Sequence, residues 1–179
     1  LGSAPPLLND TAPIENIRYL LDYTRATALV THPGIAAAIV LQARSGAMAS
    51  ELQRIFVVPD VATGDDAEGA VNAVDDPLVV SLTRALGEAP EYARPAVHRD
   101  EPAMWLFTSG STGEPKANVH SHRDFAYNTE VYAKGTVGYR EGDVSVSVPR
   151  LFFGYATGTN LFFPFAVGGT SCLFSERPT

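Results

Sequence analysis

The sequence predicts an α/β fold in which a mainly parallel sheet is flanked by helices. Short β-branched or aromatic segments alternate with segments whose apolar residues recur at helical spacing, and glycine or proline separates the two kinds. Strands that alternate with helices are typical of βαβ units, whose neighbouring strands run parallel. With 179 residues, 45% of them apolar, the chain can bury a core as one domain or as a large piece of one.

The first third of the chain shows this alternation most clearly. The pattern predicts a helix over Ile14–Tyr23, a strand over Ala28–Thr31, a helix over Ile35–Ser45 and a strand over Ile55–Val58. A Pro-Gly pair follows the first strand and a glycine follows the second helix, as expected where elements end.

The next segment is rich in turn residues and acidic charge. We expect Thr63–Asp76 to be a solvated loop. Its aspartates are therefore interpreted as solvated groups and not as a cation site; they are Asp65, Asp66, Asp75 and Asp76. Pro77 suits the first turn of a helix that runs to Leu86, with Gly87 as its C-cap.

The second half of the chain returns to alternating elements after a polar, proline-spaced loop over Glu88–Pro102. Valine and serine alternate in Val144–Val148, as they do in a half-buried strand. The predicted elements are a buried strand over Ala103–Thr108, a glycine-rich turn over Ser109–Pro115, a helix over roughly Arg123–Lys134 closed by Gly135, a strand over Val144–Val148, a helix over Gly158–Val167 and a strand over Thr170–Phe174.

Charge and composition exclude several classes of partner. The formal charge is -7 and the calculated pI is near 5.0, which argues against nucleic acid or an anionic membrane as the main partner. Apolar runs such as Leu161–Val167 are too short to span a bilayer. A homo-oligomer is compatible with the sequence.

The ends of the chain and its cysteine content bear on location. The first six residues have no basic or apolar signal region and no initiator methionine, so we expect neither a signal peptide nor the start of a gene. The single cysteine, Cys172, excludes an internal disulfide, fits a cytoplasmic location and is expected to be a buried small apolar residue.

The segment that carries chemistry is the loop Thr108–Lys116, with the sequence Thr-Ser-Gly-Ser-Thr-Gly-Glu-Pro-Lys. Gly110 and Gly113 can adopt positive φ and allow a ligand close to the backbone. The hydroxyl residues between them add side-chain donors to backbone N–H groups, and Lys116 adds a positive charge. Such an array suits a polyphosphate.

Other glycine-rich loops fit this segment poorly. Two residues, Glu114 and Pro115, separate Gly113 from Lys116, whereas in the Gly-x-x-x-x-Gly-Lys-Ser/Thr loop the lysine follows the glycine directly. A Gly-x-Ser-x-Gly nucleophile elbow is excluded because residue 109 is serine. A flexible linker is disfavoured, because we place the segment between a buried strand and a helix.

The loop resembles the signature of adenylate-forming enzymes, a superfamily of acyl- and aryl-CoA ligases, luciferases and peptide-synthetase adenylation domains. Their pattern is Ser/Thr-Ser-Gly-Ser/Thr-Thr-Gly-x-Pro-Lys-Gly, which this chain matches through Lys116 and leaves at Ala117. Ser121 and His122 resemble the Ser/Thr-His pair that opens the next helix in the family.

A second block narrows the resemblance to benzoate-CoA ligases. Arg150–Gly158 is similar to their Lys-Leu-Phe-Phe-Ala-Tyr-Gly-Leu-Gly stretch, and Ser175–Thr179 continues the likeness. The resemblance is strong from Met104 onward and weak across Ala47–Asp100. It implies that residues 1–179 are an internal part of the large N-terminal, AMP-binding domain.

The resemblance implies an ATP-dependent reaction in two steps. A carboxylic acid, here an aryl acid such as benzoate, attacks the α-phosphate of Mg-ATP, and the thiol of coenzyme A then displaces AMP to give a thioester. Binding of the β- and γ-phosphates is implied for Thr108, Ser109, Gly110, Ser111, Thr112, Gly113 and Lys116. The implied cofactors are ATP, Mg²⁺ and coenzyme A as co-substrate, and no residue is assigned to bond making itself.

The aryl-acid pocket implied by the second block involves Phe153, Gly154 and Tyr155. Phe153 matches the family's gating aromatic residue, and Gly154 stands where benzoate-type enzymes tend to have alanine, which would enlarge the pocket slightly. The other phenylalanines of this stretch, Phe163 and Phe165 among them, are expected in the core. His120 and His122 have no evident third ligand nearby, so we expect a helix-start or packing role and no metal site.

Several segments of the family have no match in this sequence. The Tyr-Gly-x-Thr-Glu segment, the ribose-binding Thr-Gly-Asp segment expected downstream of the loop, the hinge and the mobile C-terminal domain have no match in residues 1–179, so we expect the chain alone to make no thioester. Two alternatives stay open: an adenylation domain that loads a carrier protein, and a non-catalytic ATP-binding module.

Overall fold

The computed structural model describes residues 4–48, 51–58, 67–93, 95–108 and 114–174. The chain forms two compact units. One consists of Asn9–Ala93, and the other combines Leu1–Leu8 with Arg94–Thr179. Within the described residues, no helix has the length and apolar character needed to cross a membrane.

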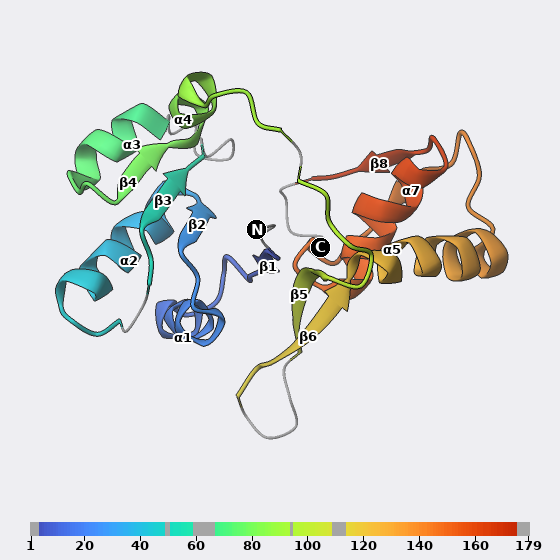
Figure 1. Cartoon of the computed structure of the whole chain (residues 1–179), viewed down its shortest axis with the longest axis horizontal. Coiled ribbons are helices and arrows are strands. Elements are labelled where there is room, and N and C mark those ends of the chain that lie inside the picture. The colour runs from blue at the N-terminus through green and yellow to red at the C-terminus, as the bar shows by residue number, and fades with distance from the viewer. Residues whose placement is uncertain (1–3, 49–50, 59–66, 94, 109–113, 175–179) are drawn as a thin grey trace. The chain divides into compact units, whose positions relative to one another are not determined.

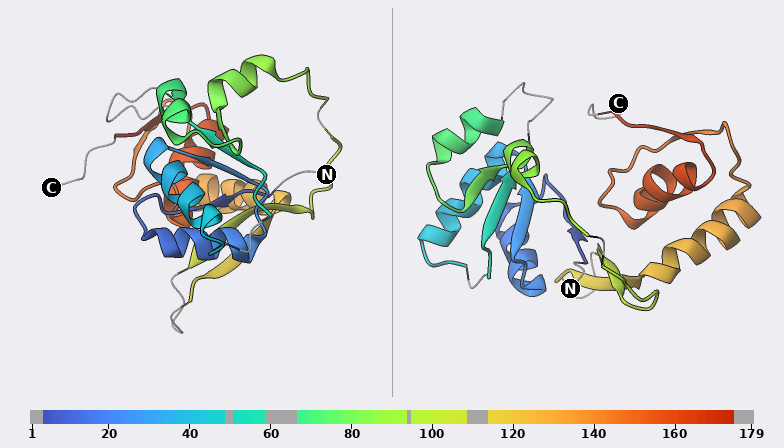
Figure 2. Two further views of the ribbon diagram at one scale, coloured as in Figure 1. Left: turned by 90° about the vertical axis from the view of Figure 1, so that its left-hand side faces the viewer. Right: turned by 45° about the horizontal axis from the view of Figure 1, so that its top comes forward.

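The unit Asn9–Ala93 is built on a parallel sheet with the strand order β2-β3-β4 (Figure 1). Helices α2 and α3 lie side by side on one face of that sheet in Figures 1 and 2. Its elements are α1 (Ile14–Thr24), β2 (Ala28–Thr31), α2 (Pro33–Arg44), β3 (Arg54–Val57), α3 (Ala67–Val74), β4 (Val79–Ser81) and α4 (Leu82–Glu88).

The core of this unit follows from the alternation along its strands. Leu29 pairs in register with Ile55, and Ile55 with Val79, so their side chains share one face of the sheet, and all three are buried. Helix α1 adds three buried apolar residues and α2 four at helical spacing: Ile17, Leu20, Leu21, Ile35, Ala36, Ile39 and Val40.

Three predictions for this unit were wrong, and two of them concern its acidic segment. Thr63–Asp76 is not entirely a loop, because α3 occupies Ala67–Val74. Asp76 is not solvated: its carboxylate accepts hydrogen bonds from Arg44 Nε (2.9 Å) and the Leu78 backbone N–H (3.0 Å), and its side chain is 9% exposed. Asp65 and Asp66 lie outside the described residues.

The predicted helix from Pro77 was also wrong in its first half. Val79–Ser81 forms strand β4, because β-branched residues there can pair with β3 and bury Val79. The helix begins only at Leu82, where the Ser81 hydroxyl accepts from the Arg84 backbone N–H (3.3 Å), and Gly87 lies inside it rather than after it.

The second unit holds a three-stranded sheet and a two-stranded sheet (Figures 1 and 2). In the order β1-β5-β6, β1 runs parallel to β5 and β6 runs antiparallel to it, whereas β7 and β8 are parallel. The strands are β1 (Pro6–Leu7), β5 (Pro102–Thr108), β6 (Lys116–Ser121), β7 (Val144–Val146) and β8 (Thr170–Cys172).

Two continuous helical rods accompany these sheets. The first is α5 (His122–Asn128), which passes directly into the π-helix η1 (Thr129–Val137). Gly138 then ends the rod with a left-handed φ of 87°. The second rod is α6 (Gly154–Thr157), the π-helix η2 (Gly158–Phe162) and α7 (Phe163–Ala166). π-Helical segments are rare and are frequently found at functional sites.

Three expectations for this unit need correction. The glycine-rich loop joins two strands rather than a strand and a helix, because Lys116–Ser121 pairs with β5. Of β5, Met104 is buried, whereas the other residues are half-buried or exposed. Cys172 is exposed, because it lies on the same side of the short strand β8 as Thr170, which is exposed as well. Four of the five strand pairs are parallel, so the mainly parallel fold is confirmed for the described residues.

Candidate functional site

The loop Thr108–Lys116 is closed by an antiparallel ladder. Thr108 and Lys116 pair across β5 and β6, and the Thr108 hydroxyl donates to the Lys116 carbonyl (3.4 Å). Both side chains are exposed. The ladder therefore fixes the two ends of the loop relative to one another. The other predicted phosphate-binding residues, Ser109, Gly110, Ser111, Thr112 and Gly113, lie outside the described residues.

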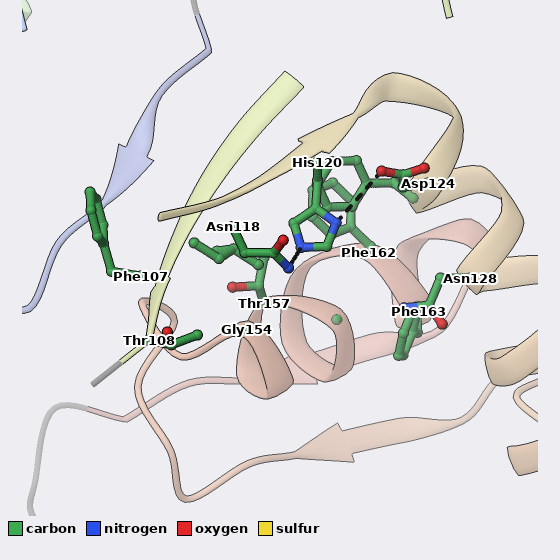
Figure 3. A pocket seen from close by; sticks show the side chains of 13 residues that line it. Phe107, Thr108, Asn118, His120, Asp124, Asn128, Gly154, Thr157, Phe162 and Phe163 are labelled. Carbon is green, nitrogen blue, oxygen red and sulfur yellow. Dashed lines mark hydrogen bonds and ion pairs between the residues drawn. The ribbon is translucent and has the colours of Figure 1, made fainter. Parts of the chain in front are cut away.

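A cavity of about 300 Å³ lies next to this hairpin (Figure 3). One wall comes from β5 and β6, a second from α5, and a third from the rod of α6, η2 and α7. Its lining residues are Leu106, Phe107, Thr108, Asn118, His120, Asp124, Phe125, Asn128, Gly154, Thr157, Gly158, Phe162 and Phe163.

Polar side chains of the cavity form a connected row from β6 to α5. Asn118 and His120 are two residues apart on one strand, so they share a face, and their Nδ2 and Nε2 atoms are 3.1 Å apart. The other ring nitrogen of His120 lies 3.7 Å from a carboxylate oxygen of Asp124. Figure 3 shows His120 between these two partners.

Asp124 also shapes the start of α5. Ser121 and Asp124 form a reciprocal capping box, in which the Ser121 backbone N–H donates to Asp124 Oδ2 (2.8 Å). Two hydrogen bonds hold the pKa of Asp124 below its ordinary value of 3.8: the one from that N–H has the larger effect, and the one from the Ser121 hydroxyl has the smaller. The charges of His120 and Arg123 lower the pKa further. Asp124 is therefore an anion at neutral pH.

The third wall is shaped by two glycines. A Cβ atom at Gly154 would lie 3.2 Å from Leu106 Cδ1, and one at Gly158 would lie 2.7 Å from the Phe163 ring. The absence of side chains therefore lets the rod approach β5 at Gly154, and lets the Phe163 ring pack against the backbone of Gly158 within the rod. Phe162 packs on Phe125 of α5 at a centroid distance of 4.4 Å, which joins the rod to the second wall.

The three residues predicted to line an aryl-acid pocket occupy different places. Gly154 lines the main cavity and also a neighbouring cavity of about 210 Å³, and Tyr155 lines only the neighbouring one. Phe153 lines neither; it is 52% exposed and its ring lies 4.3 Å from that of Phe152. Of the phenylalanines expected in the core, Phe163 is buried, whereas Phe165 is 61% exposed.

The turn that carries Phe153 is tied to the rod by Thr157. The buried Thr157 hydroxyl lies within hydrogen-bond distance of two carbonyl oxygens, those of Leu151 (2.7 Å) and Phe153 (3.1 Å). One hydroxyl proton can serve both only as a shared donor. The position of Phe153 thus depends on a side chain one helical turn further along the rod.

Sequence reasoning did not single out Asn118, Asn128 or Thr157. Once Lys116–Ser121 is known to be a strand, the spacing of Asn118 and His120 places them on one face, but the sequence pattern alone does not reveal that strand. His120 packs on Phe125 (5.8 Å) and His122 begins α5. The described part of the chain has no cluster of three or more His, Cys, Asp or Glu side chains that could hold a metal ion.

Comparisons with known proteins agree on one family. A sequence model described as AMP-binding enzyme matches residues 1–179. A benzoate–CoA ligase from Thauera aromatica is 41% identical over 139 residues, which is 76% of this chain and 26% of that protein. A 4-hydroxybenzoate–CoA/benzoate–CoA ligase from Rhodopseudomonas palustris is 32% identical over 178 residues, 99% of this chain and 30% of that protein.

Solved structures give the same picture. A crystal structure of an anthranilate CoA ligase in complex with anthranoyl-AMP superposes with a TM-score of 0.80 at 25% identity, covering 99% of this chain and 31% of that one. A benzoate CoA ligase from Burkholderia xenovorans gives a TM-score of 0.70 at 28% identity, covering 98% and 31%. The chain thus spans about a quarter to a third of the length of these relatives.

Proposed function

This chain belongs to the AMP-binding enzyme family, and on that basis we propose that it forms part of the large N-terminal domain of an AMP-forming acid–thiol ligase. The complete enzyme would use ATP to activate an aryl acid of the benzoate class and transfer the acyl group to coenzyme A. The observation that carries this proposal is the phosphate-type loop Thr108–Lys116, whose first residue also lines the aromatic cavity.

The proposed reaction has two balanced steps. A carboxylate oxygen attacks the α-phosphorus of ATP, the bond to pyrophosphate breaks, and an acyl-adenylate forms. The sulfur of coenzyme A then attacks the acyl carbon, AMP leaves with the electron pair, and the thiol proton goes to solvent. In such nucleotidyl transfer the protein mainly positions the reactants and neutralises charge.

Roles for the loop residues follow from their chemistry. We propose that the hydrogen-bond donors of Thr108–Gly113 and the Lys116 ammonium group bind the β- and γ-phosphates of ATP. The same groups would stabilise the departing pyrophosphate. The ladder supports this role, because it holds Thr108 and Lys116 at fixed ends of the loop. Mg²⁺ would arrive with the phosphates of ATP, and we assign none of the described residues to hold it.

The aryl ring is assigned to the cavities that meet at Gly154. Their walls combine aromatic rings with glycine, and a flat ring packs well against aromatic side chains. A volume of about 300 Å³ is at the small end of the range for small-molecule sites, which favours a single-ring acid over a long acyl chain. Tyr155, which lines the neighbouring cavity, would flank the same site, and Phe153 would act from outside the two cavities as the gating aromatic residue that the resemblance implies.

The test uses the complete enzyme that contains this chain. We expect acid-dependent exchange of labelled pyrophosphate into ATP with benzoate-type acids, and thioester formation only when coenzyme A is added. Lys116→Ala should lower kcat/KM for ATP about tenfold or more, as loss of a charge-assisted contact implies. Lys134→Ala is the matched control, because Lys134 pairs with Glu130 on η1 and lines neither cavity.

Three results would count against the proposal. Absence of exchange with every aryl acid would exclude the aryl-acid assignment. Exchange without thioester formation would favour a carrier-protein acceptor. Equal effects of the Lys116 and Lys134 variants would exclude a phosphate role for Lys116. We further propose that residues 1–179 alone make no thioester, since the sequence has no Tyr-Gly-x-Thr-Glu segment and no Thr-Gly-Asp segment downstream of the phosphate-type loop.

A further inference from the structure

We propose that Asn128 gives the site a preference for aryl acids that carry a hydroxyl or amino group on the ring, over unsubstituted benzoate. The inference rests on the proposed function and adds a substrate class to it. It depends on the place of Asn128 in the cavities, on its unused hydrogen-bonding groups and on the direction in which an acid must lie.

Asn128 stands where two cavities meet. It is the last residue of α5 and directly precedes the π-helix η1, and its side chain lines both the cavity of about 300 Å³ and its neighbour of about 210 Å³. The residues that line both cavities are Asn128, Gly154, Gly158 and Phe163. Of these, Asn128 alone has a polar side chain, so it is the hydrogen-bonding group at the junction.

The carboxamide of Asn128 is available to a ligand. Asn118 and His120 are paired with one another, and Asp124 is engaged by Ser121. Within the described part of the chain, the Asn128 side chain has no hydrogen-bond partner. A carboxamide has two donor hydrogens and an acceptor oxygen, so it can pair with a hydroxyl or an amino group.

The geometry of the reaction points a ring substituent toward Asn128. The acid must present its carboxylate to the α-phosphate of ATP, which adjoins the β- and γ-phosphates assigned to the loop that begins at Thr108. Figure 3 shows Thr108 at one end of the cavity and Asn128 at the other, with Gly154 and Thr157 between them. A benzoate ring held between these ends has its carboxylate toward Thr108, and a substituent on the ring extends toward Asn128.

A hydrogen bond at this junction discriminates between acids. An acid with a polar substituent gains the bond, whereas benzoate places a C–H against the carboxamide and leaves it to solvent. Because Asn128 is exposed, water can satisfy the carboxamide in the benzoate complex, so we expect a preference of about tenfold and not the far larger one of a buried pair.

The experiment measures kcat/KM for benzoate, 2-aminobenzoate, 3-hydroxybenzoate and 4-hydroxybenzoate in the complete enzyme. The ratio of the best substituted acid to benzoate is compared among wild type, Asn128→Leu and Asn128→Ala. Leucine keeps the approximate volume without hydrogen-bonding groups, and alanine is safe for folding at a helical position. Tyr127→Phe is the matched control, since the neighbouring Tyr127 lines neither cavity.

The expected result is a ratio of about ten in wild type and in Tyr127→Phe, falling to about one in both Asn128 variants. Because each ratio compares two acids on one preparation, a loss of folded protein cancels. A wild-type ratio near one, or a ratio unchanged in the Asn128 variants, would overturn the inference and leave the proposed ligase activity standing. Failure of wild type to activate any aryl acid would overturn both.

Discussion

The backbone of Gly158 lies so close to the ring of Phe163 that a Cβ atom at residue 158 would be 2.7 Å from the ring. The ring is 4% exposed, so it cannot move aside into solvent. Both residues belong to the rod that lines the two cavities, and their contact therefore sets the shape of that wall.

Gly158→Ala should destabilise the second unit although alanine is the better helix former. Overpacking costs about 1–3 kcal/mol, which exceeds the gain of about 1 kcal/mol in helix propensity. Urea denaturation followed by circular dichroism measures the change. Gly87→Ala is the control: residue 87 lies in α4, where an added Cβ atom would have no neighbour within 4 Å, so we expect stabilisation by about 0.5–1 kcal/mol. A stabilised Gly158→Ala protein would contradict the packing argument.

Thr157→Val should destabilise the turn Leu151–Phe153. Valine has nearly the same shape but cannot donate to the Leu151 and Phe153 carbonyls, and loss of such a hydrogen bond costs about 1 kcal/mol. Thr157→Ser keeps the donor and should lose less. The free energies of unfolding of both variants give the test, and the prediction fails if serine is no better than valine.

Asp76→Ala should cost more than removal of an exposed ion pair. The Asp76 carboxylate is 9% exposed and accepts from both Arg44 and the Leu78 N–H, so we expect a loss of about 1.5–3 kcal/mol. Glu51→Ala removes the partner of Arg25, where both side chains are at least half exposed, and should cost less than about 1 kcal/mol. Similar losses in the two variants, measured by urea denaturation, would show that burial of Asp76 contributes little.

The capping carboxylate of Asp124 should make stability depend on pH in the acid range. Its pKa is lower in the folded chain than the ordinary 3.8, so its stabilising effect is complete above pH 3.8 and is lost as the pH falls through the folded value. Asp124→Asn retains an acceptor for the Ser121 N–H but does not titrate. Urea denaturation at pH 5 and below pH 3.8 should therefore show that the free energy of unfolding falls more on acidification in wild type than in Asp124→Asn. Equal losses in the two proteins would refute the assignment.

The sequence predicted the strands and helices of the unit Asn9–Ala93 well where the spacing of apolar residues agrees with glycine or proline at the ends of the element. Strand β2 has the predicted bounds, and α1 and α2 differ by one or two residues at their ends. The prediction failed at Val79–Ser81, where a leading proline suggested a helix but pairing with β3 decided the structure. Strand β6 was missed for the same reason, since its partner β5 lies across the loop.

The candidate site shows the same limit. The loop was evident from its residue order, because glycines, hydroxyls and a lysine at that spacing are chemically distinctive. Asn128 was not evident from the sequence, because a single asparagine in a helix can have many structural roles. Only its position where two cavities meet distinguishes this asparagine from others. The close approach of Gly158 to Phe163 likewise depends on packing that no local pattern encodes.

Strand β5 also carries the only tryptophan of the chain, Trp105, which pairs with Pro6 of β1 and Val119 of β6 and stands three residues before Thr108. Fluorescence excited selectively in tryptophan therefore originates from the hairpin that closes the phosphate-type loop, and from nowhere else in this chain. Nucleotide titrations of the chain need no dye and no engineered label: a shift in emission on adding ATP would be an optical signal from the strand that leads into the loop.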